Sequence, residues 1–333
     1  MSRRRWFAVL PLGAGVGVVS LFALGVLPPG RAETTSQSRP DSAAGSAQQT
    51  PAEASALGTS PTSAAPTPRK PTTSRPATPS QPVRAESAPS IARVPISSPG
   101  IEAAVRSATS RGYRAGVAVV DTTTGKLWAA GDYDDMFAAE SVMKVFIATR
   151  LLATQQLTGD TADTAYRMIA QSDDGAADAL YGLTGGDEVV TWVAEHYGIS
   201  GLGSPPTKFG WWSNTHISAV GMARFYAKVK ADPLVWPWLS KAMHAATEYG
   251  SDGTYQFFGL KQADPAAAIK QGWGQDDDDW AEASDFNSTG YVNSDRYAVA
   301  IQVKGPPWEY NSGAPAAVTR IAKALMPGGV LRP

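Results

Sequence analysis

The strongest chemical signal in the sequence is a serine followed one helical turn later by a lysine. Ser141 and Lys144 stand in the run Ser-Val-Met-Lys, at the predicted start of a helix. Residues three apart share a helix face, so we expect the lysine amine beside the serine hydroxyl. A buried lysine with a lowered pKa can take the proton of a serine, and a helix start favours developing negative charge. The pair is a candidate nucleophile and base, although a serine cap followed by a lysine also begins many ordinary helices.

Two further polar motifs follow at long intervals. Ser172-Asp173-Asp174 comes directly after an apolar helical pattern at 161–171. Lys270-Gln271-Gly272, with Trp273 behind it, lies in a run that is typical of a strand. The elements around these motifs decide whether their side chains meet.

The apolar periodicity predicts those elements. Helices are expected at 101–109, 141–156, 161–171, 175–183, 187–197, 216–230 and 315–325. Strands are expected at 116–121, 126–130, 268–273, 285–292 and 297–304. This order predicts an α+β domain in which a five-stranded antiparallel sheet lies between layers of helices, the first two strands being completed by the last three.

The composition changes twice along the chain. Residues 1–32 hold three arginines and then an apolar run at 6–27, which indicates either a cleaved signal peptide or an uncleaved membrane anchor. Residues 33–94 are rich in Pro, Ser, Thr and Ala and are expected to form a disordered linker. Residues 95–333 are expected to fold as one domain, outside the cytoplasm, with membrane contact only through the N-terminal segment.

The overall charge and the absent residue types exclude several functions. With 29 Lys+Arg against 30 Asp+Glu, the formal charge is -1, and nucleic acid is not an expected partner. The sequence has no cysteine, so disulfides, thiolate metal sites and lipidation at a cysteine are excluded. The four aspartates at 276–279 fit a solvated turn better than a cation site. No metal or organic cofactor is implied.

In this order the three motifs resemble the Ser-x-x-Lys, Ser-Asp-Asn and Lys-Thr-Gly triplet of class A β-lactamases and penicillin-binding proteins. The resemblance covers most of residues 101–326 and implies a β-lactamase/transpeptidase-like fold with an additional all-helical subdomain. It also implies an exported serine hydrolase. The implied substrate is an amide, peptide or ester bearing a carboxylate, either a small molecule or a fragment of peptidoglycan.

The resemblance assigns a role to each matching residue. Ser141 would be acylated, with Lys144 as its base, and Ser172 would pass a proton to the leaving nitrogen. Lys270, Gln271 and Gly272 would bind the substrate, whose carboxylate would lie at Lys270. The backbone N–H groups of Ser141 and Trp273 would form the oxyanion hole, and Asp173 would be structural.

Three departures from the family pattern limit the implied activity. Asp174 replaces an asparagine and is expected to raise the pKa of Lys144, while Gln271 replaces a hydroxyl. The segment 198–215 contains Trp211 and Trp212 but no acid, whereas class A enzymes carry there a glutamate that activates water. Efficient β-lactamase activity is therefore not expected. Two alternatives stay open: a catalytically silent protein that binds an envelope ligand or partner, and a true β-lactamase with an unusual deacylation route.

Overall fold

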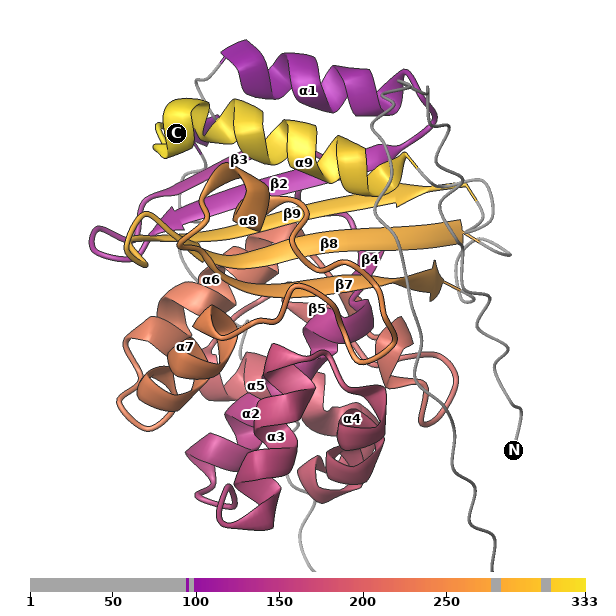
Figure 1. Ribbon diagram of the computed structural model, residues 1–333, viewed down its shortest axis with the longest axis vertical. Helices are drawn as coiled ribbons and strands as arrows, with labels where there is room; N and C mark the ends of the chain where they lie inside the picture. Colours follow the sequence, from indigo (N-terminus) through magenta and orange to yellow (C-terminus); the bar gives the residue numbers. More distant parts are fainter. Residues whose placement is uncertain (1–93, 96–98, 277–282, 307–312) are drawn as a thin grey trace, which may run out of the picture. The chain divides into compact units, whose positions relative to one another are not determined.

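The computed structural model describes residues 94–95, 99–276, 283–306 and 313–333 (Figure 1). The expected signal or anchor at 1–32, the expected linker up to residue 93, and three of the four aspartates at 276–279 lie outside these residues. Among the helices of the described ranges, none has the length and apolarity needed to cross a membrane.

A six-stranded sheet forms the centre of the domain, in the order β1-β3-β2-β9-β8-β7. Five of its strands are antiparallel neighbours, as predicted, and a short β1 is added in parallel beside β3. The strands are β1 (Val94–Pro95), β2 (Arg114–Asp121), β3 (Leu127–Gly131), β7 (Ala268–Asp276), β8 (Ala283–Val292) and β9 (Tyr297–Gly305).

The two faces of the sheet bury separate apolar cores, because successive side chains of a strand point to opposite faces. In β9, Val299 and Ile301 belong to one core, and Ala298 and Ala300 belong to the other. The first face is covered by α1 (Pro99–Thr109), α8 (Leu260–Ala263) and α9 (Ala314–Leu325), as Figure 1 shows. The second face is covered by α6 (Ala219–Lys230).

A helical subdomain lies on the second side of the sheet (Figure 1). Its rings interlock at the junction with α6, where Phe146 and Phe225 form an edge-to-face pair at 4.9 Å. Its elements are the 3₁₀ helix η1 (Glu140–Met143), α2 (Lys144–Ala153), α3 (Asp160–Ala170), α4 (Asp174–Tyr181), η2 (Gly182–Thr184), η3 (Gly186–Glu188), α5 (Val189–Tyr197), η4 (Trp212–Asn214) and α7 (Trp236–His244). The last turn of the described chain is η6 (Pro327–Gly329).

The structure differs from the sequence-based expectation in two regions. The helix expected from residue 216 begins at Ala219, because the Ser218 side chain caps it by accepting a hydrogen bond from the Gly221 amide. The two residues before Ser218 form β6 (His216–Ile217), which joins β4 (Phe137–Ala138) and β5 (Gly203–Ser204) in a small second sheet. The helix α7 was not predicted; its proline occupies the first turn, where no amide donor is needed.

Candidate active site

Ser141 and Lys144 lie at the junction of η1 and α2, and their side chains meet as the one-turn spacing predicts. The Lys144 Nζ lies 2.7 Å from the Ser141 Oγ. Ser141 is 7% exposed and Lys144 is fully buried. The residue before the serine, Glu140, has a φ of +50°, a left-handed conformation that a non-glycine residue rarely adopts. Such strain is typical of functional sites, and here it determines the direction in which the backbone enters Ser141.

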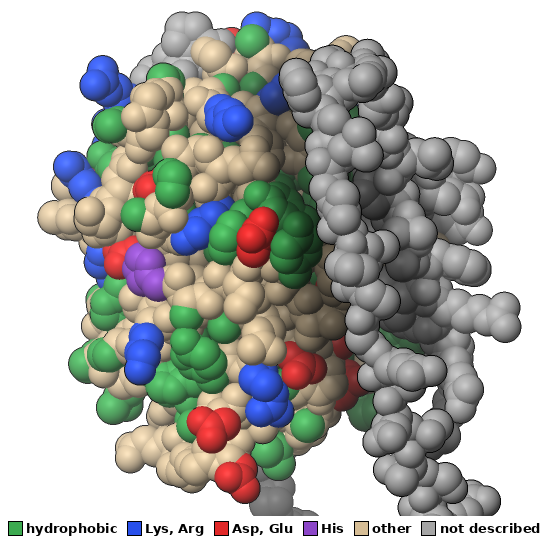
Figure 2. Space-filling model, in the orientation of Figure 1, with side chains coloured by type: hydrophobic (Ala, Val, Ile, Leu, Met, Phe, Trp, Pro, Cys, Tyr) green, Lys and Arg blue, Asp and Glu red, His purple; other side chains and the backbone are tan. Residues whose placement is uncertain are grey.

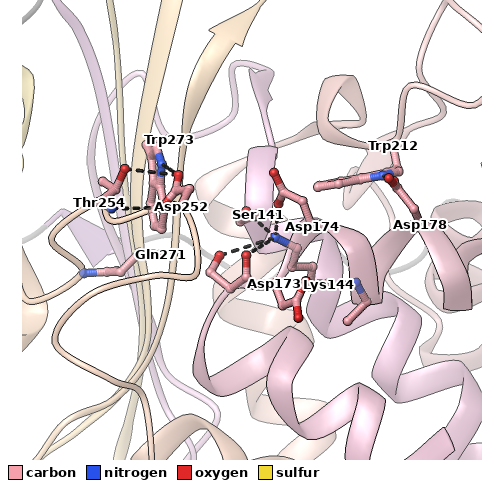
Figure 3. A network of polar contacts seen from close by, with 12 residues as sticks. Ser141, Lys144, Asp173, Asp174, Asp178, Trp212, Asp252, Thr254, Gln271 and Trp273 are labelled. Atoms are coloured by element: carbon pink, nitrogen blue, oxygen red, sulfur yellow. Dashed lines mark hydrogen bonds and ion pairs between the residues drawn. The ribbon is translucent and has the colours of Figure 1, made fainter. Parts of the chain in front are cut away.

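Ser172 brings the second lysine into the cluster. It occupies the turn between α3 and α4 with a φ of +54°, and it is 4% exposed. The Lys270 Nζ donates to the Ser172 Oγ at 2.8 Å, and the Lys144 Nζ lies 3.4 Å from the same oxygen. One hydroxyl therefore lies between two amines that are 126 residues apart in the sequence. The structure thus brings together Ser141, Lys144, Ser172 and Lys270; Figure 3 shows Ser141 and Lys144 side by side.

The two aspartates that follow Ser172 have different contacts. Asp173 caps α4, because its Oδ1 accepts from the Ala176 amide at 3.0 Å, and its Oδ2 lies 3.6 Å from the Arg167 Nε. The neighbouring Asp174 turns to the cluster and accepts from the Lys144 Nζ at 2.6 Å. Asp173 is therefore structural, as expected, and Asp174 is a direct partner of the candidate base.

The contacts of Lys144 satisfy its amine in both protonation states. A charged ammonium has three N–H donors, and three acceptors lie within 2.8 Å: the Ser141 Oγ, the Ser172 carbonyl and an Asp174 oxygen. A neutral amine keeps two donors, which the carbonyl and the carboxylate accept, and its lone pair then accepts from the Ser141 hydroxyl. The two states differ in the direction of one hydrogen bond, so a proton can pass from serine to lysine without any rearrangement.

Burial lowers the pKa of both lysines. For Lys144, desolvation is the largest effect, and the Asp174 carboxylate raises the pKa against it. For Lys270, desolvation and then the charge of Lys144 bring the pKa well below its usual range. Two neighbouring amines that share Ser172 disfavour a second positive charge, and this keeps one of them available as a base.

The strand β7 delivers Lys270 to the cluster but turns Gln271 away from it. The Gln271 Nε2 donates to the carbonyls of Gln256 at 3.0 Å and Phe258 at 2.7 Å. Figure 3 shows its side chain directed away from Ser141. Gln271 was expected to bind substrate; in the structure both donors of its side-chain amide are used by backbone carbonyls.

Glycines allow β7 to lie against η1. A Cβ on Gly272 would come within 2.5 Å of the Ala139 carbonyl oxygen, so this glycine serves close packing where substrate binding was expected. A Cβ on Gly274 would lie 2.1 Å from a Glu140 carboxylate oxygen. The segment before Ser141 is therefore seated directly on the backbone that follows Trp273.

Two tryptophans flank the lysines, and each is held by an aspartate (Figure 3). The Trp212 ring centroid lies 5.0 Å from the Lys144 Nζ, and its Nε1 donates to Asp178 at 2.8 Å. Trp273 lies 5.9 Å from the Lys270 Nζ, and its Nε1 donates to Asp252 at 3.1 Å. Trp212 comes from the segment 198–215, in which the family resemblance implies a water-activating acid. The sequence analysis missed Asp178 and Asp252, since neither stands in a motif.

His196 and His244 have partners away from this cluster. His196 stacks on Trp192 at 4.6 Å, and His244 lies 3.1 Å from Asp295, so neither bonds to Ser141. Within the described residues, no group of three or more His, Asp or Glu side chains is placed to hold a metal ion.

The chain has the fold of the β-lactamases, as comparison with solved structures shows. A class A β-lactamase of Bacteroides cellulosilyticus DSM 14838 superposes with a TM-score of 0.54 at 17% identity, over 69% of this chain and 96% of that one. The TLA-1 extended-spectrum β-lactamase superposes with a TM-score of 0.55 at 13% identity, over 69% and 98%. At these identities the likeness establishes the shared fold.

Similarity in amino-acid sequence identifies a narrower family. The chain is 32% identical over 247 residues to LppW of Mycobacterium tuberculosis (strain ATCC 25618 / H37Rv), whose name marks it provisionally as a lipoprotein. The same identity holds for LppW of Mycobacterium bovis (strain ATCC BAA-935 / AF2122/97), and the match spans 69% of this chain and 74% of the relative. This protein belongs to the LppW family. The sequence matches no protein-family model.

Proposed function

We propose that this protein is an extracytoplasmic serine hydrolase that is acylated at Ser141. The observation that carries the proposal is the 2.7 Å hydrogen bond between the Ser141 Oγ and the Lys144 Nζ, in a cluster completed by Ser172 and Lys270. A nucleophile within hydrogen-bond reach of a base that other groups orient in turn is the arrangement that covalent catalysis requires.

In the acylation step the Ser141 oxygen attacks the carbonyl carbon of an amide, peptide or ester, and its proton passes to Lys144. The Asp174 carboxylate stabilises the ammonium that forms. We assign the oxyanion hole to the backbone N–H groups of Ser141 and Trp273, because β7 is the outermost strand of the described sheet and packs against η1. Removing one such donor typically costs about 2.7–4 kcal/mol in the barrier.

The leaving group departs with a proton from Ser172. The Ser172 oxygen then regains a proton from one of the two lysine amines, since the Lys270 Nζ lies 2.8 Å and the Lys144 Nζ 3.4 Å from it. The tetrahedral intermediate then collapses to an ester on Ser141. Because Trp212 covers Lys144 and the described segment 198–215 contributes no acid, we expect this ester to hydrolyse slowly.

The fold constrains the identity of the substrate less than it constrains the acylation step. The resemblance implies a substrate carboxylate, as a small molecule or peptidoglycan fragment would carry. Since Gln271 is turned away, Lys270 alone is left to receive it. Two donors of Lys270 already go to the Ser172 Oγ and the Gln271 carbonyl, so a single N–H remains.

The proposed location outside the cytoplasm rests on the N-terminal sequence and on the relative. LppW carries a lipoprotein's name. The sequence of this protein has no cysteine to which a lipid could be attached, so the apolar run at 6–27 would provide export or anchoring instead.

Covalent labelling tests the proposal. The purified protein is incubated with a fluorophosphonate and with a fluorescent penicillin, and the adduct is located by mass spectrometry. We expect labelling of Ser141 that is lost in Ser141→Ala and kept in Ser107→Ala, a serine on α1 outside the site. Absence of labelling by both probes would overturn the proposal.

The same experiment separates the two alternatives. The first alternative, a silent envelope-binding protein, is favoured by the 2.6 Å contact between Lys144 and Asp174, because the carboxylate stabilises the protonated lysine. Such a protein would react with neither probe. A true β-lactamase with an unusual deacylation route would hydrolyse nitrocefin rapidly and keep no penicillin adduct, while the fluorophosphonate would still label Ser141.

A further inference from the structure

The side chains that surround the two lysines carry negative charge and aromatic rings. Asp178 and Asp252 accept the indole N–H groups of Trp212 and Trp273, and Asp174 contacts Lys144. Figure 3 shows one tryptophan–aspartate pair on each side of Ser141. The site therefore has two walls of the same composition, each an indole ring with a carboxylate at its edge.

The charges of these walls do not cancel. Lys144 compensates Asp174, and Arg167 lies beside Asp173. Among the described residues, no lysine, arginine or histidine forms an ion pair with Asp178 or Asp252. Asp252 acts electrostatically on the buried Lys144 and Lys270, and desolvation by burial lowers the pKa of both lysines. Both Asp178 and Asp252 are exposed, so an approaching substrate meets their charge.

The wall that contains Asp252 also presents further rings to solvent. Tyr249 and Tyr255 are 56% and 40% exposed, and their centroids are 5.7 Å apart. The backbone between them reaches the site, because a Cβ on Gly250 would lie 3.4 Å from the Trp273 ring. Figure 2 shows hydrophobic side chains gathered around an acidic one over the segment that connects α7 and α8. Ring faces beside carboxylates attract organic cations and oppose anions.

We propose that Asp252 is a specificity-determining residue that selects acyl substrates with a positively charged group, such as a substituted ammonium, near the scissile carbonyl. This inference rests on the proposed acylation of Ser141, and it replaces the substrate carboxylate that the family resemblance implies. The cation would lie beside the exposed Asp252 carboxylate, on the side where the Tyr249 and Tyr255 rings reach solvent, and Lys270 would serve Ser172.

Three p-nitrophenyl esters of matched length test the selection. They are the esters of 4-(trimethylammonio)butanoate, of 5,5-dimethylhexanoate and of glutarate, which are cationic, neutral and anionic at the same position. The trimethylammonio and tert-butyl ends have nearly the same shape, so their comparison isolates charge. We expect the second-order rate of Ser141 acylation to fall in that order, by about tenfold between the cationic and the neutral ester.

Asp252→Asn removes the charge and keeps one oxygen, which can accept from the Trp273 indole and the Thr254 hydroxyl as the Asp252 Oδ2 does. We expect it to abolish most of the preference for the cationic over the neutral ester, while Asp160→Asn at the far end of α3 leaves it unchanged. In the wild-type protein the preference should also weaken as NaCl rises from 0.05 to 0.5 M, a test that needs no variant. An equal rate for the three esters, or a preference for the anionic one, would refute the inference.

Binding without acylation keeps this inference separable from the proposed function. In Ser141→Ala, the corresponding primary amides are titrated and the fluorescence of the flanking tryptophans is recorded. Selective quenching by the cationic amide supports the charge selection even where no ester acylates Ser141. Acylation by all three esters with no selective quenching would leave the hydrolase intact and remove the role of Asp252.

Discussion

The Lys144 ammonium and the Asp174 carboxylate form a 2.6 Å ion pair in which the lysine is fully buried and the aspartate is about half exposed. Burial lowers the pKa of Lys144, and the carboxylate raises it. The pKa of the candidate base Lys144 therefore depends on two opposing effects, and replacing the Asp174 carboxylate by an amide would remove one of them.

Asp174→Asn is expected to speed the acylation of Ser141 at neutral pH. Without the carboxylate, the pKa of Lys144 falls further, and each unit gives about tenfold more neutral amine while the pH stays below that pKa. The rising limb of the pH–rate profile should move to lower pH. Acylation rates from pH 5 to 10 measure this, with Asp163→Asn on α3 as the control. A slower rate with an unshifted profile would contradict our account of the pair.

Ser172→Ala is expected to discriminate between leaving groups. An amide nitrogen must be protonated to leave, whereas p-nitrophenolate leaves without a proton. Since general acid catalysis contributes about 10²–10⁴-fold, amide turnover should fall by about 100-fold or more, and ester acylation far less. Rates on an amide and on a p-nitrophenyl ester with the same acyl group provide the comparison. Equal losses on both would indicate that Ser172 only positions Lys144.

Gly274→Ala is expected to destabilise the domain by about 1–3 kcal/mol, because the added methyl group would overlap the Glu140 carboxylate. Acylation should fall as well, since Glu140 precedes Ser141. Urea denaturation measures the stability. Gly182→Ala is a matched control, as nothing lies within 4 Å of a Cβ there. In a double-mutant cycle with Glu140→Ala, additive effects would show that the two residues do not interact.

Lys270→Met is expected to abolish amide turnover and yet to raise stability at pH 7. The folded-state pKa of Lys270 lies well below its unfolded value of about 10.4, so the unfolded chain binds more protons between these values. Wild-type stability should therefore rise with pH across that window, and the advantage of the methionine should shrink toward its upper end. Urea denaturation at pH 7.0, 8.5 and 10 tests this, with the exposed Lys241→Met as control. A loss of stability that is equal at every pH would oppose it.

Much of the fold and of the cluster could be predicted because local rules determine them. The one-turn spacing of Ser141 and Lys144 fixes their contact once a helix forms. Apolar runs such as 117–120 in β2 and 298–301 in β9 indicated strands of the antiparallel sheet. The two-residue strands β4, β5 and β6 are too short to leave such a pattern, and Val94, expected to end the linker, joins β3 as part of β1.

The missed parts of the site depend on contacts between distant segments. Asp252 reaches Trp273 across 21 residues, and Asp178 reaches Trp212 across 34. Neither pairing follows from spacing, because irregular segments connect the partners. The contacts of Gln271 likewise depend on a distant segment, since its amide donates to the carbonyls of Gln256 and Phe258, 15 and 13 residues away.

The strand order also has a mechanical consequence. The chain that precedes the domain joins it at β1, and Lys270 lies on β7 at the opposite edge of the sheet. Five inter-strand steps of about 4.8 Å separate these edges by roughly 24 Å. A pulling force on the chain before Val94 would act first on the β1–β3 pairings, which join Val94 to Trp128 and Pro95 to Ala129. Loss of these two pairings would leave the pairings of β7 with β8 and of β8 with β9, on which the position of Lys270 depends, as they are.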